Sequence, residues 1–216
     1  MDEKEILCSP HEKHPLEFVA IVTSIAIALQ KLSTAASLNI GRDCYLHAVL
    51  GQALLKDAGY ESRIQCGAAA WRIGEGDGDV ISHIPGQTGH VPAGMKGFAY
   101  HAWLDCNGVL VDFTTYQLRQ KAAELDELDG QHTNVDWCPD FLILEKRDIR
   151  SYRDVAQLHT GMAFYEALPT LEKAIANGFS LNEEDLAMAR LVLASPDMEV
   201  FGPNHYRCGS QQQASR

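Results

Sequence analysis

The chain has 216 residues, a length that suits one domain with a substantial core. It is 46% hydrophobic and 22% charged, close to the globular average, which argues against wholesale disorder. Its formal net charge is −11 and it has no cluster of Lys and Arg, which argues against nucleic acid or an anionic membrane surface as the main partner.

The N-terminal part predicts one long buried helix. The opening "MDEKEILCSPHEKHP" is acidic and polar, where a secretory signal would be basic and then apolar. The apolar run Phe18–Leu29 is shorter than the ~20 residues that cross a bilayer. We therefore expect a core helix over 15–37, with Pro15 at its start and Leu16 among its apolar positions, in a cytoplasmic protein.

A second helix is expected from about Cys44 to Ala58. Asp43 is its natural N-cap, and Gly59 provides the C-terminal stop. The expected buried stripe is Leu46, Val49, Leu50, Ala53 and Leu54. The segment that follows, "SRIQCGAAAWRI" (62–73), predicts a strand, and its apolar residues on both faces indicate a central one.

Residues 74–97 are rich in Gly and Pro and predict a long loop, a kind of segment that is usually functional or mobile. His83 and His90 lie in it, and we interpret both as polar loop residues. The six cysteines form no CxxC pair, so a structural zinc site is not predicted. Cys66 and Cys106 stand inside strand-like runs and are expected to be core residues.

The segment "FAYHAWLDC-NG-VLVDFTTY" predicts a β-hairpin, because Asn-Gly between alternating runs is the strongest short hairpin signal. A two-residue turn sets the expected pairs as Cys106–Val109, Asp105–Leu110, Leu104–Val111 and Trp103–Asp112. Since side chains alternate along a strand, His101, Trp103 and Asp112 should project from one face. His101 and Asp112 would then be diagonal neighbours within reach of each other.

The rest of the chain predicts a polar helical connector over 117–129, a strand over 140–146 and two helices. The first helix spans about Met162–Ala176 and is broken or kinked by Pro169, and the second spans about Leu181–Ala194. Ser180 and Glu183 stand in capping-box spacing before the second helix. The order of helices, antiparallel sheet and helices predicts a single α+β domain over 1–208, with a disordered tail over 209–216.

Cys44, His101 and Asp112 together predict nucleophilic chemistry. A cysteine in the first turn of a helix lies beside free backbone N–H groups and the positive end of the dipole, which favour a thiolate and could receive an oxyanion. His101 supplies the base, and Asp112 would fix its tautomer and stabilise the imidazolium. Each residue alone has an ordinary structural interpretation, so the spacing of all three carries the hypothesis.

The segments "GRDCYLHA" and "YHAWLDCNGVLVDFT" resemble the core of the transglutaminase-like branch of the papain-like cysteine proteinases. The resemblance covers about residues 39–115, and within that superfamily the chain looks like a small group of bacterial proteins. It implies a papain-like fold, in which a helix with an N-terminal cysteine packs on an antiparallel sheet, with additional C-terminal helices here. It also implies Cys44 as nucleophile, His101 as base and Asp112 as orienting group, without a cofactor or metal.

The expected activity is acyl transfer through a thioester on a peptide or a small amide or ester, with water or an amine as acceptor. Asn39 and Trp103 are the candidates for oxyanion and substrate binding, although a core role for Trp103 is equally compatible with its position. Two other classes stay open. The chain could be a catalytically inactive binding module of the same fold, or Cys44, His47, His101 and Asp112 could hold the metal of a hydrolase, although His47 is better interpreted as structural or exposed. The residues do not give the oligomeric state.

Overall fold

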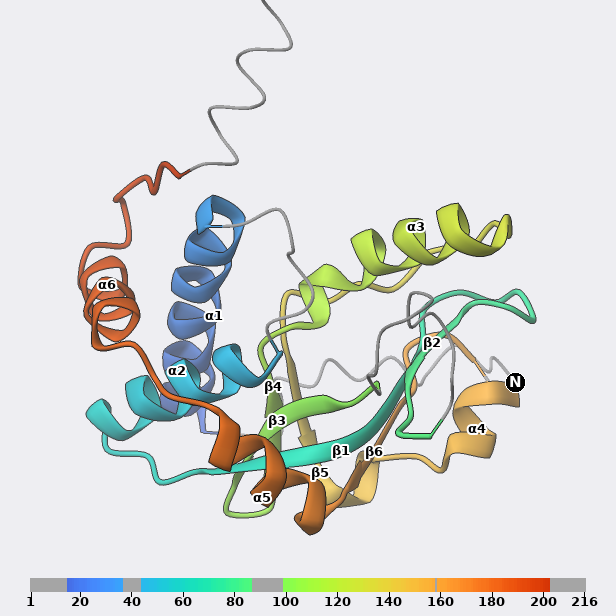
Figure 1. Cartoon of the computed structure of the whole chain (residues 1–216), viewed down its shortest axis with the longest axis horizontal. Helices are drawn as coiled ribbons and strands as arrows, with labels where there is room; N and C mark the ends of the chain where they lie inside the picture. The colour runs from blue at the N-terminus through green and yellow to red at the C-terminus, as the bar shows by residue number, and fades with distance from the viewer. Residues whose placement is uncertain (1–14, 37–43, 87–98, 158, 203–216) are drawn as a thin grey trace, which may run out of the picture.

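The computed structural model describes residues 15–36, 44–86, 99–157 and 159–202 (Figure 1). The predicted Asp43 cap, Asn39, His90 and the 209–216 tail therefore lie outside the described residues. The helices are α1 (Leu16–Ala36), α2 (Cys44–Asp57), α3 (Leu118–Asp129), α4 (Tyr152–Gln157), α5 (Pro169–Gly178) and α6 (Glu183–Ala194). The strands are β1 (Arg63–Arg72), β2 (Val80–His83), β3 (His101–Cys106), β4 (Val109–Asp112), β5 (Leu142–Glu145) and β6 (Ala163–Ala167).

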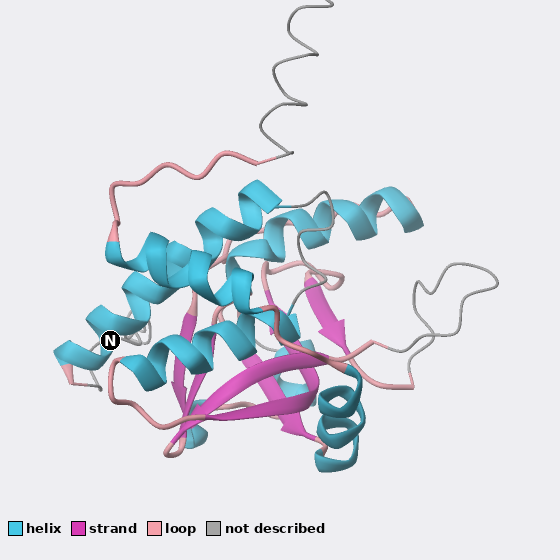
Figure 2. Ribbon diagram, turned by 60° about the vertical axis from the view of Figure 1, so that its left-hand side comes forward, coloured by secondary structure: helices cyan, strands magenta, loops and turns pink. Residues whose placement is uncertain are grey.

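All described strands join one six-stranded sheet in the order β2-β1-β3-β4-β5, with β6 also paired to β1. Every pairing is antiparallel, and α1, α2, α5 and α6 lie before or after the strands in sequence, so the chain has the predicted α+β class. β1 pairs with β2, β3 and β6, which confirms its predicted central place. Figure 2 shows the strands as one curved sheet with helices packed across it.

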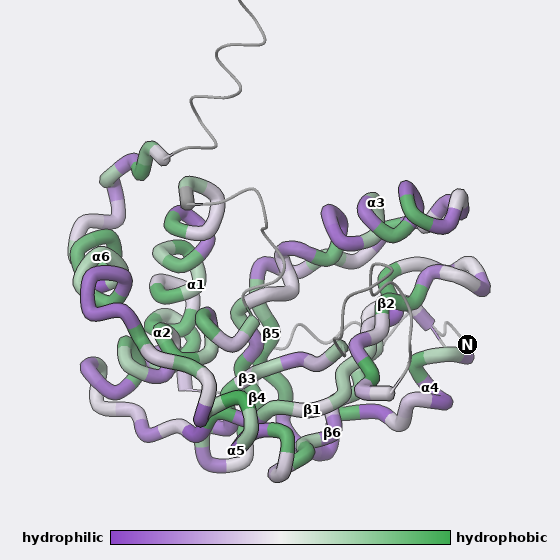
Figure 3. Tube along the Cα trace, in the orientation of Figure 1, coloured by the Kyte–Doolittle hydropathy of each residue, from purple (hydrophilic) through white to green (hydrophobic). Residues whose placement is uncertain are grey.

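The sheet separates two apolar cores. On one face α1, α2 and α6 cover Cys66, Leu104 and Val111, and the three helices lie together at the left of Figure 1. The other face carries Trp71 and Trp103 and is covered by α3, which is mostly hydrophilic along its length in Figure 3. α2 lies between the sheet and the other two helices of its layer. The predicted stripe is only partly right: Leu50 and Leu54 are buried, whereas Leu46, Val49 and Ala53 are partly buried. The broad buried face that contacts the sheet, α1 and α6 consists of Tyr45, His47, Ala48, Leu50, Gly51, Leu54 and Leu55.

The β3–β4 hairpin has the predicted register. Cys106 pairs with Val109, Asp105 with Leu110 and Leu104 with Val111. Asn107 and Gly108 have φ of 54° and 91°, the left-handed values that a two-residue turn requires at both central positions. Because the pairing has not slipped, His101, Trp103 and Asp112 share the face of the second core, as predicted.

Three local predictions are wrong. The 74–97 segment contains a strand, β2, because its Val80–His83 run pairs with the central strand β1. The first part of the predicted helix over 162–176 is instead the strand β6, because it pairs with the long strand β1. Helix α5 begins only at Pro169. The last helix is capped by Asn182, whose side chain accepts from the Glu184 N–H, rather than by Ser180.

Helix α1 is longer than the apolar run within it. By length and composition Leu16–Ala35 could cross a membrane, a property that core helices of soluble proteins and signal sequences share. Here Val22, Ile25 and Leu29 are buried in the core that α1 shares with α2 and α6, as the sequence predicts. Leu16, predicted to join them, is 85% exposed at the first turn of the helix.

Candidate active site

Cys44, His101 and Asp112 each stand at the end of an element. Cys44 is the first residue of α2, His101 opens β3, and Asp112 closes β4. The helix packs on one face of the sheet, whereas His101 and Asp112 project from the other. The thiol therefore meets the imidazole where the start of the helix reaches the end of the strands, and both side chains line one cavity.

His101 and Asp112 form a buried pair. The Nε2 of His101 lies 2.8 Å from the Asp112 Oδ2, and the two residues are 2% and 0% exposed. The same Oδ2 accepts from the Tyr165 hydroxyl at 2.7 Å, and Oδ1 accepts from the backbone N–H and the hydroxyl of Thr114 at 2.8 and 2.7 Å. The carboxylate is thus held on both oxygens, which fixes the plane in which it meets the imidazole.

Tyr165 links the pair to the centre of the sheet. It lies on β6, where its hydroxyl oxygen accepts a hydrogen bond of 2.8 Å from the Trp71 indole N–H. The same hydroxyl donates a hydrogen bond to Asp112. The Trp71 ring also stands edge-on to the His101 ring, with centroids 4.7 Å apart. Sequence reasoning missed both aromatic residues: Tyr165 because β6 was predicted as helix, and Trp71, on the correctly predicted β1, because the pairing of β1 with β6 has no local signal.

The pair is held in its ionised form. Burial alone would lower the pKa of His101, but the charge and hydrogen bond of Asp112, together with nearby Cys44, raise it to about 10. Burial alone would raise the pKa of Asp112, but the His101 charge and the hydrogen bonds from His101, Thr114 and Tyr165 lower it to about 2. An imidazolium beside a carboxylate is therefore the favoured state at neutral pH.

Since Nε2 is bound to Asp112, Nδ1 is the His101 nitrogen available to the thiol. Cys44 is near enough to raise the pKa of the imidazole, while Nδ1 has no fully formed hydrogen bond with any described residue. Catalytic hydrogen bonds are often long before substrate binds. The Tyr100 side chain also interacts with Cys44, and burial followed by this neighbour raises the pKa of its phenol. Nothing in the sequence marked Tyr100.

The other predicted site residues have different places. Trp103 is 5% exposed and packs beside His101 and Tyr165 within the second core, and it does not line the cavity at Cys44. His47 is buried, and its Nε2 lies 3.1 Å from the Tyr116 hydroxyl. Within the described residues no three His, Cys, Asp or Glu side chains are grouped so that they could hold a metal ion. The alternative set of metal ligands, Cys44, His47, His101 and Asp112, is therefore not brought together among the described residues.

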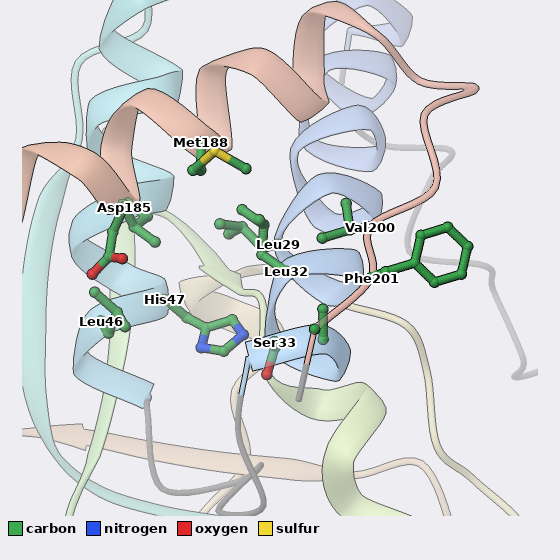
Figure 4. Close-up of a pocket in the computed structure, with 12 residues that line it drawn as sticks. Leu29, Leu32, Ser33, Leu46, His47, Asp185, Met188, Val200 and Phe201 are labelled. Atoms are coloured by element: carbon green, nitrogen blue, oxygen red, sulfur yellow. The ribbon is translucent and has the colours of Figure 1, made fainter. Parts of the chain in front are cut away.

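A larger cavity of about 260 Å³ lies between α1, α2 and α6. Its walls are mostly apolar, with Leu29 and Leu32 from α1 and Met188 from α6, and the His47 ring points into it (Figure 4). Phe201 stands at its edge with the ring turned outward. This cavity contains none of Cys44, His101 or Asp112, so it is separate from the candidate active site.

No known protein family and no curated protein matches this sequence. A solved structure named "The crystal structure of genomics APC5867" superposes with a TM-score of 0.53 over 84% of this chain and 82% of its own. The two sequences are 13% identical. At this identity the likeness shows the fold alone, an α+β arrangement of an antiparallel sheet and several helices.

Proposed function

We propose that the protein is a cysteine hydrolase or acyltransferase of papain-like, transglutaminase-like architecture, which acts on an amide or peptide substrate through a thioester on Cys44. The observation that carries the proposal is the buried His101–Asp112 pair, because His101 lines the same cavity as Cys44 and interacts with its thiol. In a histidine and an aspartate buried only to support the fold, both ring nitrogens would be expected to have partners, whereas the His101 Nδ1 has no fully formed hydrogen bond with any described residue.

Thioester formation follows from the tautomer. Because Asp112 accepts the Nε2 hydrogen, Nδ1 takes the thiol proton of Cys44, and the raised pKa of His101 keeps that proton on the ring. The thiolate attacks the carbonyl carbon, and free N–H groups of the first turn of α2 hold the oxyanion. The imidazolium then gives its proton to the leaving nitrogen as the carbon–nitrogen bond breaks.

The second half of the reaction needs an acceptor. Water or an amine attacks the thioester carbon, and neutral His101 takes the proton of the attacking atom at Nδ1. The carbon–sulfur bond breaks, and its electron pair returns to the Cys44 sulfur. Hydrolysis to an acid and transfer to an amine therefore use the same residues, with Asp112 holding the ring in place throughout.

Iodoacetamide labelling at pH 6 tests the proposal. A thiolate paired with an imidazolium reacts at this pH, whereas an ordinary thiol is almost fully protonated. We expect Cys44 to be alkylated at least about tenfold faster than Cys8 in the N-terminal segment, as measured by mass spectrometry of peptides from the intact protein. The His101→Ala variant should remove this advantage.

Buried Cys66 and Cys106 provide internal controls, since burial raises the pKa of each thiol to about 12 and both should stay unlabelled while the protein is folded. Labelling of Cys44 no faster than Cys8 would contradict the proposal and favour a non-catalytic binding module of this fold. The comparison within one chain keeps differences in protein concentration and reagent out of the result.

A further inference from the structure

A second histidine lines the cavity that holds Cys44 and His101. His83 lies on the edge strand β2, opposite Ala69 of β1, and its ring centroid is 5.8 Å from that of His101. Trp71 stands edge-on to both imidazoles and lines the same cavity. His83 was predicted as a polar loop residue, and the strand that carries it to the site was not predicted.

The Nδ1 of His83 is a buried acceptor. It has no hydrogen-bond partner among the described residues, as is also true of the His101 Nδ1. His83 hydrogen-bonds to the backbone of Tyr100, so this bond uses Nε2 and leaves the lone pair on Nδ1. Burial, then the charges of His101 and of Lys121 at the cavity wall, lower the pKa of His83 to about 3 against the opposing effect of Asp112. The ring is neutral throughout the working pH range.

The cavity that both histidines line has a volume of about 20 Å³, room for about one water molecule or one amino group. A single oxygen or nitrogen atom can lie about 3 Å from two acceptors at once, which suits rings at this separation. An atom that bonds to both Nδ1 atoms must bring two hydrogens, because each of these nitrogens is an acceptor without a partner among the described residues when His101 is neutral. The cavity is therefore shaped and polarised for a small donor of two hydrogen bonds.

We propose that His83 is a catalytic residue of the second half-reaction, which binds the acyl acceptor and selects acceptors with two hydrogens on the attacking atom, namely water or a primary amine. This inference rests on the proposed thioester chemistry. His101 takes one hydrogen of the acceptor as a proton, and His83 accepts a hydrogen bond from the other, so that the attacking lone pair is aimed at the thioester carbon. The new bond forms as the carbon–sulfur bond breaks, and His83 neither gains nor loses a proton overall.

Hydrolysis of 4-nitrophenyl acetate by the full chain separates the two half-reactions. A burst of 4-nitrophenolate reports acetylation of Cys44, and the slower steady rate reports attack by water. In the His83→Phe variant, which keeps an aromatic ring against Trp71, we expect the burst rate to stay within about threefold and the steady rate to fall at least about tenfold. The His83→Asn variant, whose side-chain oxygen can accept in place of Nδ1, should recover most of the steady rate.

Acceptor choice gives a readout that a purely structural role of His83 would not change. Water brings two hydrogens on its attacking atom, as a primary amine does, whereas methanol brings one. The ratio of methyl acetate to acetate formed in added methanol should rise at least about fivefold in His83→Phe, because only attack by water loses its second contact. If that variant does not fold, His83→Ala with added imidazole serves instead, and imidazole should restore the steady rate and the original ratio.

The outcomes distinguish the two proposals. Absence of a burst in the unmodified protein would overturn the thioester mechanism and this inference with it. A normal burst with an unchanged steady rate and product ratio in His83→Phe would overturn the role of His83 alone and leave the mechanism standing. Equal loss of burst and steady rate in His83→Phe and His83→Asn would also overturn it, since His83 would then only support the fold.

Discussion

Asp112 is bonded at every position a carboxylate offers. Its two oxygens accept from His101, from Tyr165 and twice from Thr114, and a carboxylate has about four lone-pair sites. Full occupancy explains how a charge can be stable at 0% exposure, because each donor offsets part of the desolvation cost. Because each of the four donors occupies its own site on the carboxylate, removal of one donor leaves that site without its hydrogen bond.

The Tyr165→Phe variant tests this point. Removal of the hydroxyl leaves the Trp71 indole N–H without its partner and takes one donor from Asp112. We expect the free energy of unfolding to fall by about 1–3 kcal/mol, as measured by urea denaturation at neutral pH. Tyr152→Phe is the matched control, since Tyr152 is 38% exposed and should lose less than about 0.5 kcal/mol. Equal effects of the two changes would show that the Tyr165 hydroxyl adds nothing.

At the scale of elements, Gly67 permits the close approach of β6 to β1. A Cβ at this position would overlap the backbone carbonyl of Glu166, and the Leu168 N–H bonds to the Cys66 carbonyl beside it. Because the obstructing atoms belong to the backbone, a side chain cannot simply rotate away. β6 carries Tyr165, so the same close approach places the hydroxyl that reaches Asp112.

We expect Gly67→Ala to lower the free energy of unfolding by about 3 kcal/mol, because the strands must separate to admit the methyl group. Gly178→Ala is the control: the methyl group would meet nothing within 4 Å at the end of α5, and the change should be within about 0.5 kcal/mol. Thermal and urea unfolding measure both variants. An unchanged free energy of unfolding in Gly67→Ala would contradict the close approach of β6 to β1 at this position.

The elements that the sequence predicted correctly are those with local causes. Asn107-Gly108 and the alternation beside it determine the hairpin and bring His101 to Asp112 within one short segment. The strands β6 and β2 were not predicted, because their conformation comes from pairing with β1. For β6 this partner strand is distant in sequence, and for β2 the flanking glycines obscure the strand pattern. Tyr165 and His83 were missed for the same reason, since each reaches the site on a strand whose existence depends on tertiary contacts.

At the scale of the whole molecule, the two facing histidines make stability depend on pH in opposite directions. His101 has a pKa of about 10, above its ordinary value of 6.5, so the stability it contributes is complete below pH 6.5 and is lost as the pH rises through 10. His83 has a pKa of about 3, so its contribution is complete above pH 6.5 and is lost as the pH falls towards 3. The free energy of unfolding should therefore be greatest near pH 6.5.

Urea denaturation between pH 5 and 8.5 measures this maximum, with slopes of up to about 1.4 kcal/mol per pH unit on either side. In His101→Gln the alkaline slope should flatten while the acid slope persists, and in His83→Phe the reverse is expected. A stability that rises steadily from pH 6.5 to 8.5 in the unmodified protein would contradict an imidazolium held by Asp112.

The pairing of β6 with β1 also has a consequence for the order in which the candidate site is completed. Cys44, His101 and Asp112 are all synthesised before residue 113, but the hydroxyl that completes the Asp112 shell arrives only with residue 165. A chain that has emerged only as far as the β3–β4 hairpin contains Cys44, His101 and Asp112 without the strand that carries Tyr165. The candidate site, with Cys44 beside His101, is therefore complete only when the last strand of the sheet has been added.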